Sequence, residues 1–165
     1  MDTFVSAIIV AAGSSTRMGT GRSKQFIELN GEPVIKHTLR VFEKSDIINS
    51  VVVVCREQDE DKIKAIIKDS GFNKIKAIVY GGDTRDKSVK NGVGVCDERT
   101  THYAVHDGAR PLVSQDDIKA VVTEAFKCKA AALGTPVTDT IKVVNENNEI
   151  VYTPERSTLR AVQTP

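Results

Sequence analysis

Apolar residues follow two patterns along the chain, and the two patterns alternate. Short, mostly apolar runs are typical of strands, and the most β-branched of them, Val5–Ala11 and Ser50–Cys55, are typical of strands that are covered on both faces. They predict strands at Val5–Ala11, Ser50–Cys55, Ile75–Tyr80, Tyr103–His106 and Ala130–Val137. Elsewhere apolar residues recur at every third or fourth position, as in a helix with one buried face. This spacing predicts a helix that Pro33 opens, with Ile35, Leu39 and Phe42 inward, and helices over Asp59–Asp69, Lys87–Val95 and Asp116–Lys129.

Helix-end signals support these boundaries. Gly71 is expected to end the second helix, and Ser114 to cap the last one. A different pattern occurs over Lys142–Thr153, where two short β-like runs flank Asn145–Glu149 and predict a hairpin.

Strands that alternate with helices indicate βαβ units, right-handed crossovers and a parallel sheet. At 165 residues the chain fits one domain of this α/β class. Ligands of such sheets bind outside the carboxyl ends of the strands. Polar segments directly follow three of the predicted strands, and we expect them to lie together at one edge of the sheet: Gly13–Lys24, Gly81–Ser88 and Asp107–Arg110.

The composition argues against several classes of protein. Hydrophobic residues make up 40% and charged residues 27%, a balance typical of folded domains. The net charge of +1, the absence of tryptophan and the 5% of aromatic residues give no indication of a nucleic-acid partner. The longest apolar run, Ala7–Ala12, is too short to cross a bilayer, and no signal-like segment precedes it, so no membrane partner is expected.

The cysteines indicate a reducing environment. Cys55, Cys96 and Cys128 are odd in number, widely spaced and without C-x-x-C, so neither a disulfide framework nor a zinc site is expected. This usage is typical of a cytoplasmic protein.

The segment Gly13–Lys24 has the composition of a phosphate cradle. Its glycines allow backbone N–H groups to surround an anion. Arg17 offers a planar fork for a phosphate, and Lys24 offers a compact charge. Neither a P-loop nor a dinucleotide fingerprint is present, which also excludes a P-loop phosphohydrolase. We predict a polyphosphate site; the alternative is a solvated turn with incidental cations.

The other two segments have both a binding and a plain structural interpretation. Gly81 and Gly82 leave the backbone free to bond a planar ligand edge, with Ser88 adding a side chain; the alternative is an ordinary strand-to-helix turn. Asp107, at a strand end, is placed to hold Mg²⁺ together with substrate phosphates. Arg110 follows it in a turn, and the alternative there is a surface Asp–Arg pair.

The ordered motifs "AAGSSTRMGTGRSKQFIELNGEPVIKHTL", "GGDTRDKSVKNG", "VHDGARP", "PVTDTIKVV" and "TPERSTLRAVQTP" are more informative together. They resemble the 2-C-methyl-D-erythritol 4-phosphate cytidylyltransferase family of the non-mevalonate isoprenoid pathway. The resemblance implies one nucleotidyltransferase domain over residues 1–165, with a doubly wound, Rossmann-like, mostly parallel sheet and a protruding β-hairpin arm at about 138–156. It also implies a homodimer formed through that arm. The implied reaction joins CTP and methylerythritol 4-phosphate, with Mg²⁺, by in-line attack on the α-phosphorus.

The same resemblance assigns roles to individual residues. Arg17 and Lys24 match the catalytic pair that stabilises charge on the triphosphate. The nucleotide-binding positions are Ala11, Ala12, Gly13, Gly82, Asp83 and Ser88. The acceptor-binding positions are Asp107, which also matches the metal-binding position, Arg110, Thr140 and Arg156. Some of these are expected to reach the site of a neighbouring subunit through the arm.

Two other functions stay open at this stage. A ribitol 5-phosphate cytidylyltransferase has a similar nucleotide loop. Because family members continue past the position of Pro165 and carry another substrate-binding lysine there, the chain is expected to be incomplete at its C-terminal side. A non-catalytic nucleotide-binding fragment is therefore the remaining alternative.

Overall fold

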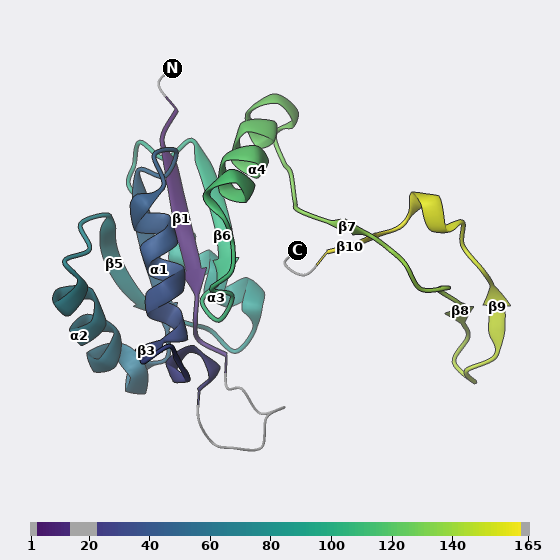
Figure 1. Ribbon diagram of the computed structural model, residues 1–165, viewed down its shortest axis with the longest axis horizontal. Coiled ribbons are helices and arrows are strands. Elements are labelled where there is room, and N and C mark those ends of the chain that lie inside the picture. The colour runs from purple at the N-terminus through teal and green to yellow at the C-terminus, as the bar shows by residue number, and fades with distance from the viewer. Residues whose placement is uncertain (1–2, 14–22, 163–165) are drawn as a thin grey trace.

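The computed structural model describes residues 3–13 and 23–162. Its centre is a parallel sheet with the strand order β5-β4-β1-β6 (Figure 1). The strands are β1 (Val5–Val10), β4 (Ser50–Cys55), β5 (Ile75–Tyr80) and β6 (His102–Asp107). β1 pairs in parallel with both β4 and β6, and Ile8 lies opposite Val52 on one side and Val105 on the other. The predicted parallel sheet is confirmed, as are four of the predicted strands.

Helices cover both faces of this sheet. Successive side chains of a strand point to opposite faces, so apolar side chains on each face need a helix to cover them. The core on one face combines Val5, Ala7 and Ile9 of β1 with buried residues of helices α1 (Val34–Lys44), α2 (Glu60–Ser70) and α4 (Gln115–Cys128). Figure 1 shows α1 lying across β1 on this face. On the other face, helix α3 (Arg85–Val93) packs so closely that a Cβ on Gly92 would lie 2.6 Å from Ile8 Cγ2.

The predicted helix ends are mostly confirmed. Gly71 follows α2 in the left-handed conformation, at φ 63°. Ser114 caps α4 in a reciprocal capping box with Asp117. The role predicted for Pro33 is wrong by one position. Its backbone is extended, with ψ 138°, so it is the N-cap residue of α1 and not the first helical residue. It is also the second residue of the short strand β3 (Glu32–Pro33), which pairs antiparallel with β2 (Glu28–Leu29).

The predicted strand at Ala130–Val137 is wrong. Over Ala130–Val137 the chain is irregular and mostly exposed, and only β7 (Thr135–Pro136) forms, paired antiparallel with β10 (Arg160–Ala161). Alanine and glycine have little preference for strands, and Pro136 has no N–H for a central ladder. Within residues 3–13 and 23–162 no further strand lies beside β6.

The predicted hairpin is confirmed and lies in an arm that extends away from the sheet (Figure 1). Strands β8 (Val143–Val144) and β9 (Ile150–Tyr152) pair antiparallel, and Asn145 N–H donates to the Glu149 carbonyl at 3.0 Å. The short 3₁₀ helix η4 (Arg156–Thr158) follows. Side chains of β9 are exposed, as expected of an element that does not pack on the domain core. In the part of the chain that the structure describes, no helix is long and apolar enough to cross a membrane.

Candidate active site

The beginnings of the three polar segments meet at the carboxyl edge of the sheet, as predicted. Gly108 N–H donates to the Val10 carbonyl at 2.8 Å, which joins the end of β6 to the end of β1. A Cβ on Gly108 would lie 3.0 Å from Ala11 Cβ. Gly81 N–H donates to the Cys55 carbonyl at 2.9 Å, which places the second segment at the end of β4. The edge therefore gathers backbone from every strand of the sheet.

The first segment, Gly13–Lys24, is described at Gly13 and at Ser23–Lys24, and Ala11 and Ala12 are described before it. Arg17 lies outside the described residues. Lys24 begins the 3₁₀ helix η2 (Lys24–Phe26) and is half-buried. Its neighbour Gln25 is buried and donates from Nε2 to the Ala11 carbonyl at 2.8 Å. This bond brings Lys24 beside the residues that follow β1, where the sequence predicted a phosphate site.

The second segment is held in shape by its own side chains. The hydroxyl of Ser88, which is 3% exposed, accepts from Gly82 N–H at 3.1 Å and donates to the Thr84 carbonyl at 2.9 Å. Thr84 caps α3 by accepting from Lys87 N–H. Asp83 is exposed and pairs with the Lys87 ammonium at 2.9 Å. Ser88 therefore shapes the loop, and the exposed Gly82 and Asp83 form its outer surface.

Close packing around Gly81 makes a specific prediction. A Cβ on Gly81 would overlap Ala12 Cβ and lie 2.9 Å from Ser88 Oγ. Gly81→Ala is therefore expected to lower the free energy of unfolding by about 1–3 kcal/mol, because the two loops must separate to admit the methyl group. Urea denaturation measures this. The control is Gly94→Ala, where a Cβ would meet nothing closer than 3.6 Å. Equal losses in the two variants would contradict the packing argument.

The third segment forms an ion cluster around Asp107. Its Oδ1 accepts from Arg85 Nη2 at 3.3 Å and its Oδ2 from Arg110 Nε at 2.9 Å. The Asp107 side chain is 28% exposed, and those of Arg85 and Arg110 are 35% and 37% exposed. Asp107 is thus shared by two guanidinium groups at the rim of the sheet. The isolated Asp107–Arg110 surface pair that the sequence also allowed does not describe this cluster, because Arg85 takes part in it.

Sequence reasoning did not identify Arg85. It is the first residue of α3, and the crossover from β5 to β6 carries that helix over β4 and β1, with its start near the end of β6. An arginine at the start of the helix after a Gly-Gly turn is a weak signal by itself. Only the crossover geometry pairs it with a carboxylate 22 positions further along.

The turn after Asp107 is fixed from two sides. The hydroxyl of Thr38, a fully buried residue of α1, donates to the Gly108 carbonyl at 2.9 Å. His106 donates from Nε2 to the Arg110 carbonyl at 3.1 Å and lies against the Phe42 ring. Burial lowers the pKa of His106 below its ordinary value, which favours the neutral ring. These contacts hold the backbone that carries Arg110.

Asp107 is suited to contact a magnesium ion held mainly by a substrate. A carboxylate has about four lone-pair sites, so one bond to each oxygen leaves capacity for a cation. Mg²⁺ commonly takes one or two carboxylates, with phosphate oxygens and water completing its ligands. Among residues 3–13 and 23–162, no group of three or more His, Cys, Asp or Glu residues forms a metal cage.

Thr140 and Arg156 do not join this edge within one chain. Both lie on the arm, where Arg156 Nη1 donates to the Thr138 carbonyl at 3.0 Å and both residues are exposed. Figure 1 shows the arm directed away from the strand ends.

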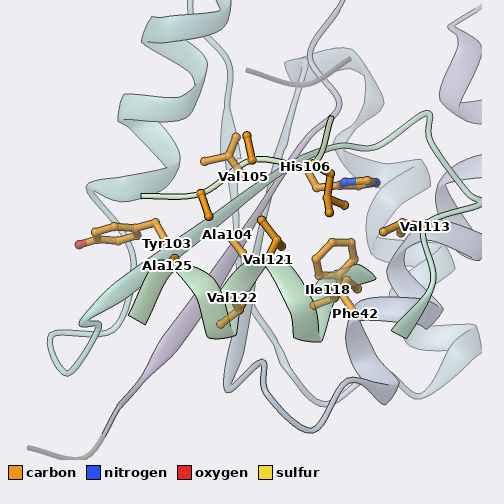
Figure 2. A pocket seen from close by; sticks show the side chains of 13 residues that line it. Phe42, Tyr103, Ala104, Val105, His106, Val113, Ile118, Val121, Val122 and Ala125 are labelled. Carbon is orange, nitrogen blue, oxygen red and sulfur yellow. The ribbon is translucent and has the colours of Figure 1, made fainter. Parts of the chain in front are cut away.

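A separate apolar pocket lies between β6 and α4. Figure 2 shows Phe42, Val105 and Val121 among its lining side chains. None of the predicted site residues lines it. The pocket is therefore distinct from the candidate site at the strand ends.

Comparison with known proteins places the chain among cytidylyltransferases. It matches the family model of IspD, 2-C-methyl-D-erythritol 4-phosphate cytidylyltransferase, over residues 5–165. It is 42% identical over 161 residues to the protein of that name from Alkaliphilus oremlandii, covering 97% of this chain and 68% of that protein. It is 44% identical over 162 residues to the one from Alkaliphilus metalliredigens, covering 98% of this chain and 67% of the relative.

Solved structures agree with this similarity. The 4-diphosphocytidyl-2C-methyl-D-erythritol synthase from Anaerococcus prevotii superposes with a TM-score of 0.83 at 30% identity, covering 99% of this chain and 68% of that one. The 2-C-methyl-D-erythritol 4-phosphate cytidylyltransferase from Thermus thermophilus gives a TM-score of 0.67 at 26% identity, covering 100% and 69%. The predicted α/β fold class is confirmed by these likenesses.

Proposed function

Since the chain belongs to the 2-C-methyl-D-erythritol 4-phosphate cytidylyltransferase family, we propose that it transfers the cytidylyl group of CTP to 2-C-methyl-D-erythritol 4-phosphate. The products are 4-diphosphocytidyl-2-C-methyl-D-erythritol and pyrophosphate. The observation that carries the proposal is the convergence of the three segments at the carboxyl edge. Hydrogen bonds join Gln25 to Ala11, Gly81 to Cys55 and Gly108 to Val10 there.

The reaction is a single in-line displacement. A phosphate oxygen of the acceptor forms a bond to the α-phosphorus of CTP as the bond to the bridging oxygen of the β-phosphate breaks, and pyrophosphate leaves. The attacking oxygen is already anionic, so the protein supplies no general base. Positioning and charge stabilisation carry most of the catalysis in such transfers. Lys24, together with Arg17, would act as a fixed cation on the triphosphate.

The other segments bind and orient the substrates in this proposal. The backbone of Ala11–Gly13 approaches the phosphates, and the loop of Gly82, Asp83 and Ser88 holds the cytosine. Mg²⁺ is the proposed metal: Asp107 would hold it beside phosphate oxygens of CTP, and when bound it would neutralise charge on the triphosphate. Arg110, fixed by Asp107 and His106, would bind the acceptor phosphate.

The position of the arm favours a site shared between two subunits. Thr140 and Arg156 are exposed on an arm that extends from the domain, so in a homodimer they would reach the acceptor in the partner's site. Mixing two inactive variants tests this. Lys24→Ala and Arg156→Ala subunits should together recover part of the activity, because one site of the mixed dimer has both native residues. Recovery should be absent if Lys24 and Arg156 of the same chain act together.

Release of pyrophosphate tests the activity itself. The protein is incubated with CTP and Mg²⁺ alone, with methylerythritol 4-phosphate, and with ribitol 5-phosphate. We expect release only with methylerythritol 4-phosphate. Release without an acceptor would indicate hydrolysis of CTP, and release with ribitol 5-phosphate alone would assign the other acceptor. CTP binding without release in any mixture would indicate a binding protein. The reducing, cytoplasmic setting expected from the cysteines is part of this proposal.

A further inference from the structure

A buried carboxylate contacts Gln25, the residue that follows Lys24. Asp59 is 3% exposed and precedes helix α2, a position where aspartate usually caps the helix. Its side chain makes no capping bond. The carboxylate instead accepts from Arg56 Nε at 2.7 Å and lies 3.5 Å from Gln25 Nε2. Asp59 therefore faces the carboxyl edge of the sheet and contacts one residue far from it in the sequence, Gln25.

This carboxylate connects to both neighbours of Lys24. Arg56 donates from Nη2 to the hydroxyl of Ser23, the residue before Lys24. Gln25, the residue after Lys24, donates to the Ala11 carbonyl at 2.8 Å. The backbone of Lys24 is thus held on one side by the Arg56–Asp59 pair and on the other by the end of β1.

Stability alone is a weak explanation for this arrangement. Asp59 is buried but the Arg56 side chain is 27% exposed, so solvent screens the guanidinium while the carboxylate is still desolvated, and such a pair contributes little net stability. Such groups are retained in some proteins because they specify one local conformation. Here the conformation that they specify is that of Ser23–Gln25, in which the catalytic cation of the proposed function stands.

We propose that Arg56, Asp59 and Gln25 are positioning residues for Lys24. They do not touch the substrate; they fix the 3₁₀ helix η2 against Ala11, so that the ammonium of Lys24 is directed consistently at the triphosphate. The inference rests on the proposed function, because it assigns these residues an effect on turnover that passes through Lys24. A displacement of about 1 Å in a catalytic group can cost up to about 10²-fold in rate.

The test combines variants of the cluster with Lys24→Ala. Asp59→Asn keeps the shape of the side chain and removes the charge that orients Arg56. It is expected to lower kcat about 10-fold with little change in KM for CTP. In the Lys24→Ala background the same substitution should lower kcat less than about twofold, because the effects of two substitutions that act through one residue do not add. Ser23→Ala removes only the hydroxyl that Arg56 contacts and is expected to cause a smaller loss, about threefold, with the same dependence on Lys24.

Amide exchange gives a readout that is independent of turnover. The N–H groups of Phe26 and Ile27 donate to the Ser23 and Lys24 carbonyls at 3.0 and 3.2 Å. Their exchange should accelerate in Asp59→Asn. The matched control is Glu32→Gln, which disrupts an ion pair with Arg40 at 2.7 Å on another element and should change neither kcat nor these amides.

The outcomes separate the two proposals. If Asp59→Asn lowers kcat by the same factor in the unaltered protein and in the Lys24→Ala variant, the positioning role is overturned and Asp59 has a purely structural role. Faster exchange with normal kcat in Asp59→Asn and Ser23→Ala would do the same. If the unaltered protein releases no pyrophosphate, the proposed function itself fails, and if Lys24→Ala is fully active, the inference fails with the role of Lys24.

Discussion

Lys24→Ala is expected to lower turnover about 10²-fold or more while the protein stays folded, because removing one preorganised charge from a developing anion costs this much in comparable sites. Lys24 begins a short 3₁₀ helix next to the end of β1 and is half-buried. A partly buried residue on a fixed backbone directs its ammonium with little loss of entropy during the reaction. KM for CTP should change less than kcat, since the charge matters most in the transition state.

Pyrophosphate release under saturating substrates measures this effect, and Lys62→Ala is its control. Lys62 also places an ammonium beside η2, 5.3 Å from the centre of the Phe26 ring, but it belongs to none of the three segments. Its loss should leave turnover near normal. Lys24→Arg should recover only part of the rate, because a planar guanidinium does not replace a compact ammonium. Arg17→Ala is expected to cause a similar loss. Near-normal turnover in either alanine variant would remove that residue from the mechanism.

Asp107→Asn is the second change for which we expect a large effect, about 10²-fold in turnover. The carboxylate separates two guanidinium groups, with Arg85 and Arg110 each bonded to one oxygen. An amide of the same shape removes the compensating charge, so the two cations repel each other and Arg110 loses its orientation. The variant should also need more Mg²⁺ for half-maximal activity, because the proposed metal loses its carboxylate.

Two measurements distinguish these contributions for Asp107. A raised KM for the acceptor reports the orientation of Arg110, and a shifted Mg²⁺ dependence reports the metal. Asp97→Asn is the control, since it breaks a comparable pair with Arg99 at 2.7 Å before β6 begins, at the opposite end of that strand. If Asp107→Asn behaves like Asp97→Asn in both measurements, the cluster at the rim of the sheet has no part in catalysis.

The main elements were predictable because their burial is continuous. All of β4 and most of β1 are buried, which fits the almost wholly apolar runs that the sequence displays there. The gathering of the three segments followed from the same argument, since parallel strands have their carboxyl ends at one edge. The run Ala130–Val137 forms no central strand, because apolar composition alone does not supply a neighbouring strand to pair with.

The positions of Arg85 and Asp59 were not predictable. Asp59 precedes an amphipathic helix and has the local signature of a cap, yet its carboxylate turns toward Gln25, 34 positions away. Nothing near Arg85 indicates that it would share a carboxylate with Arg110. Both contacts join side chains from different βα units, so they depend on how the helices pack on the sheet.

The sequence by itself determined the alternation of strands and helices, the chemistry of the residues at the strand ends and the hairpin of the arm, because these follow from local periodicity and residue type. Only the tertiary structure decided which charges pair around Asp107, which residues flank Lys24 and hold it against Ala11, and that Thr140 and Arg156 lie away from the edge of their own sheet. These contacts depend on distances of a few tenths of an ångström between segments far apart in the chain, and close packing of the whole domain sets those distances.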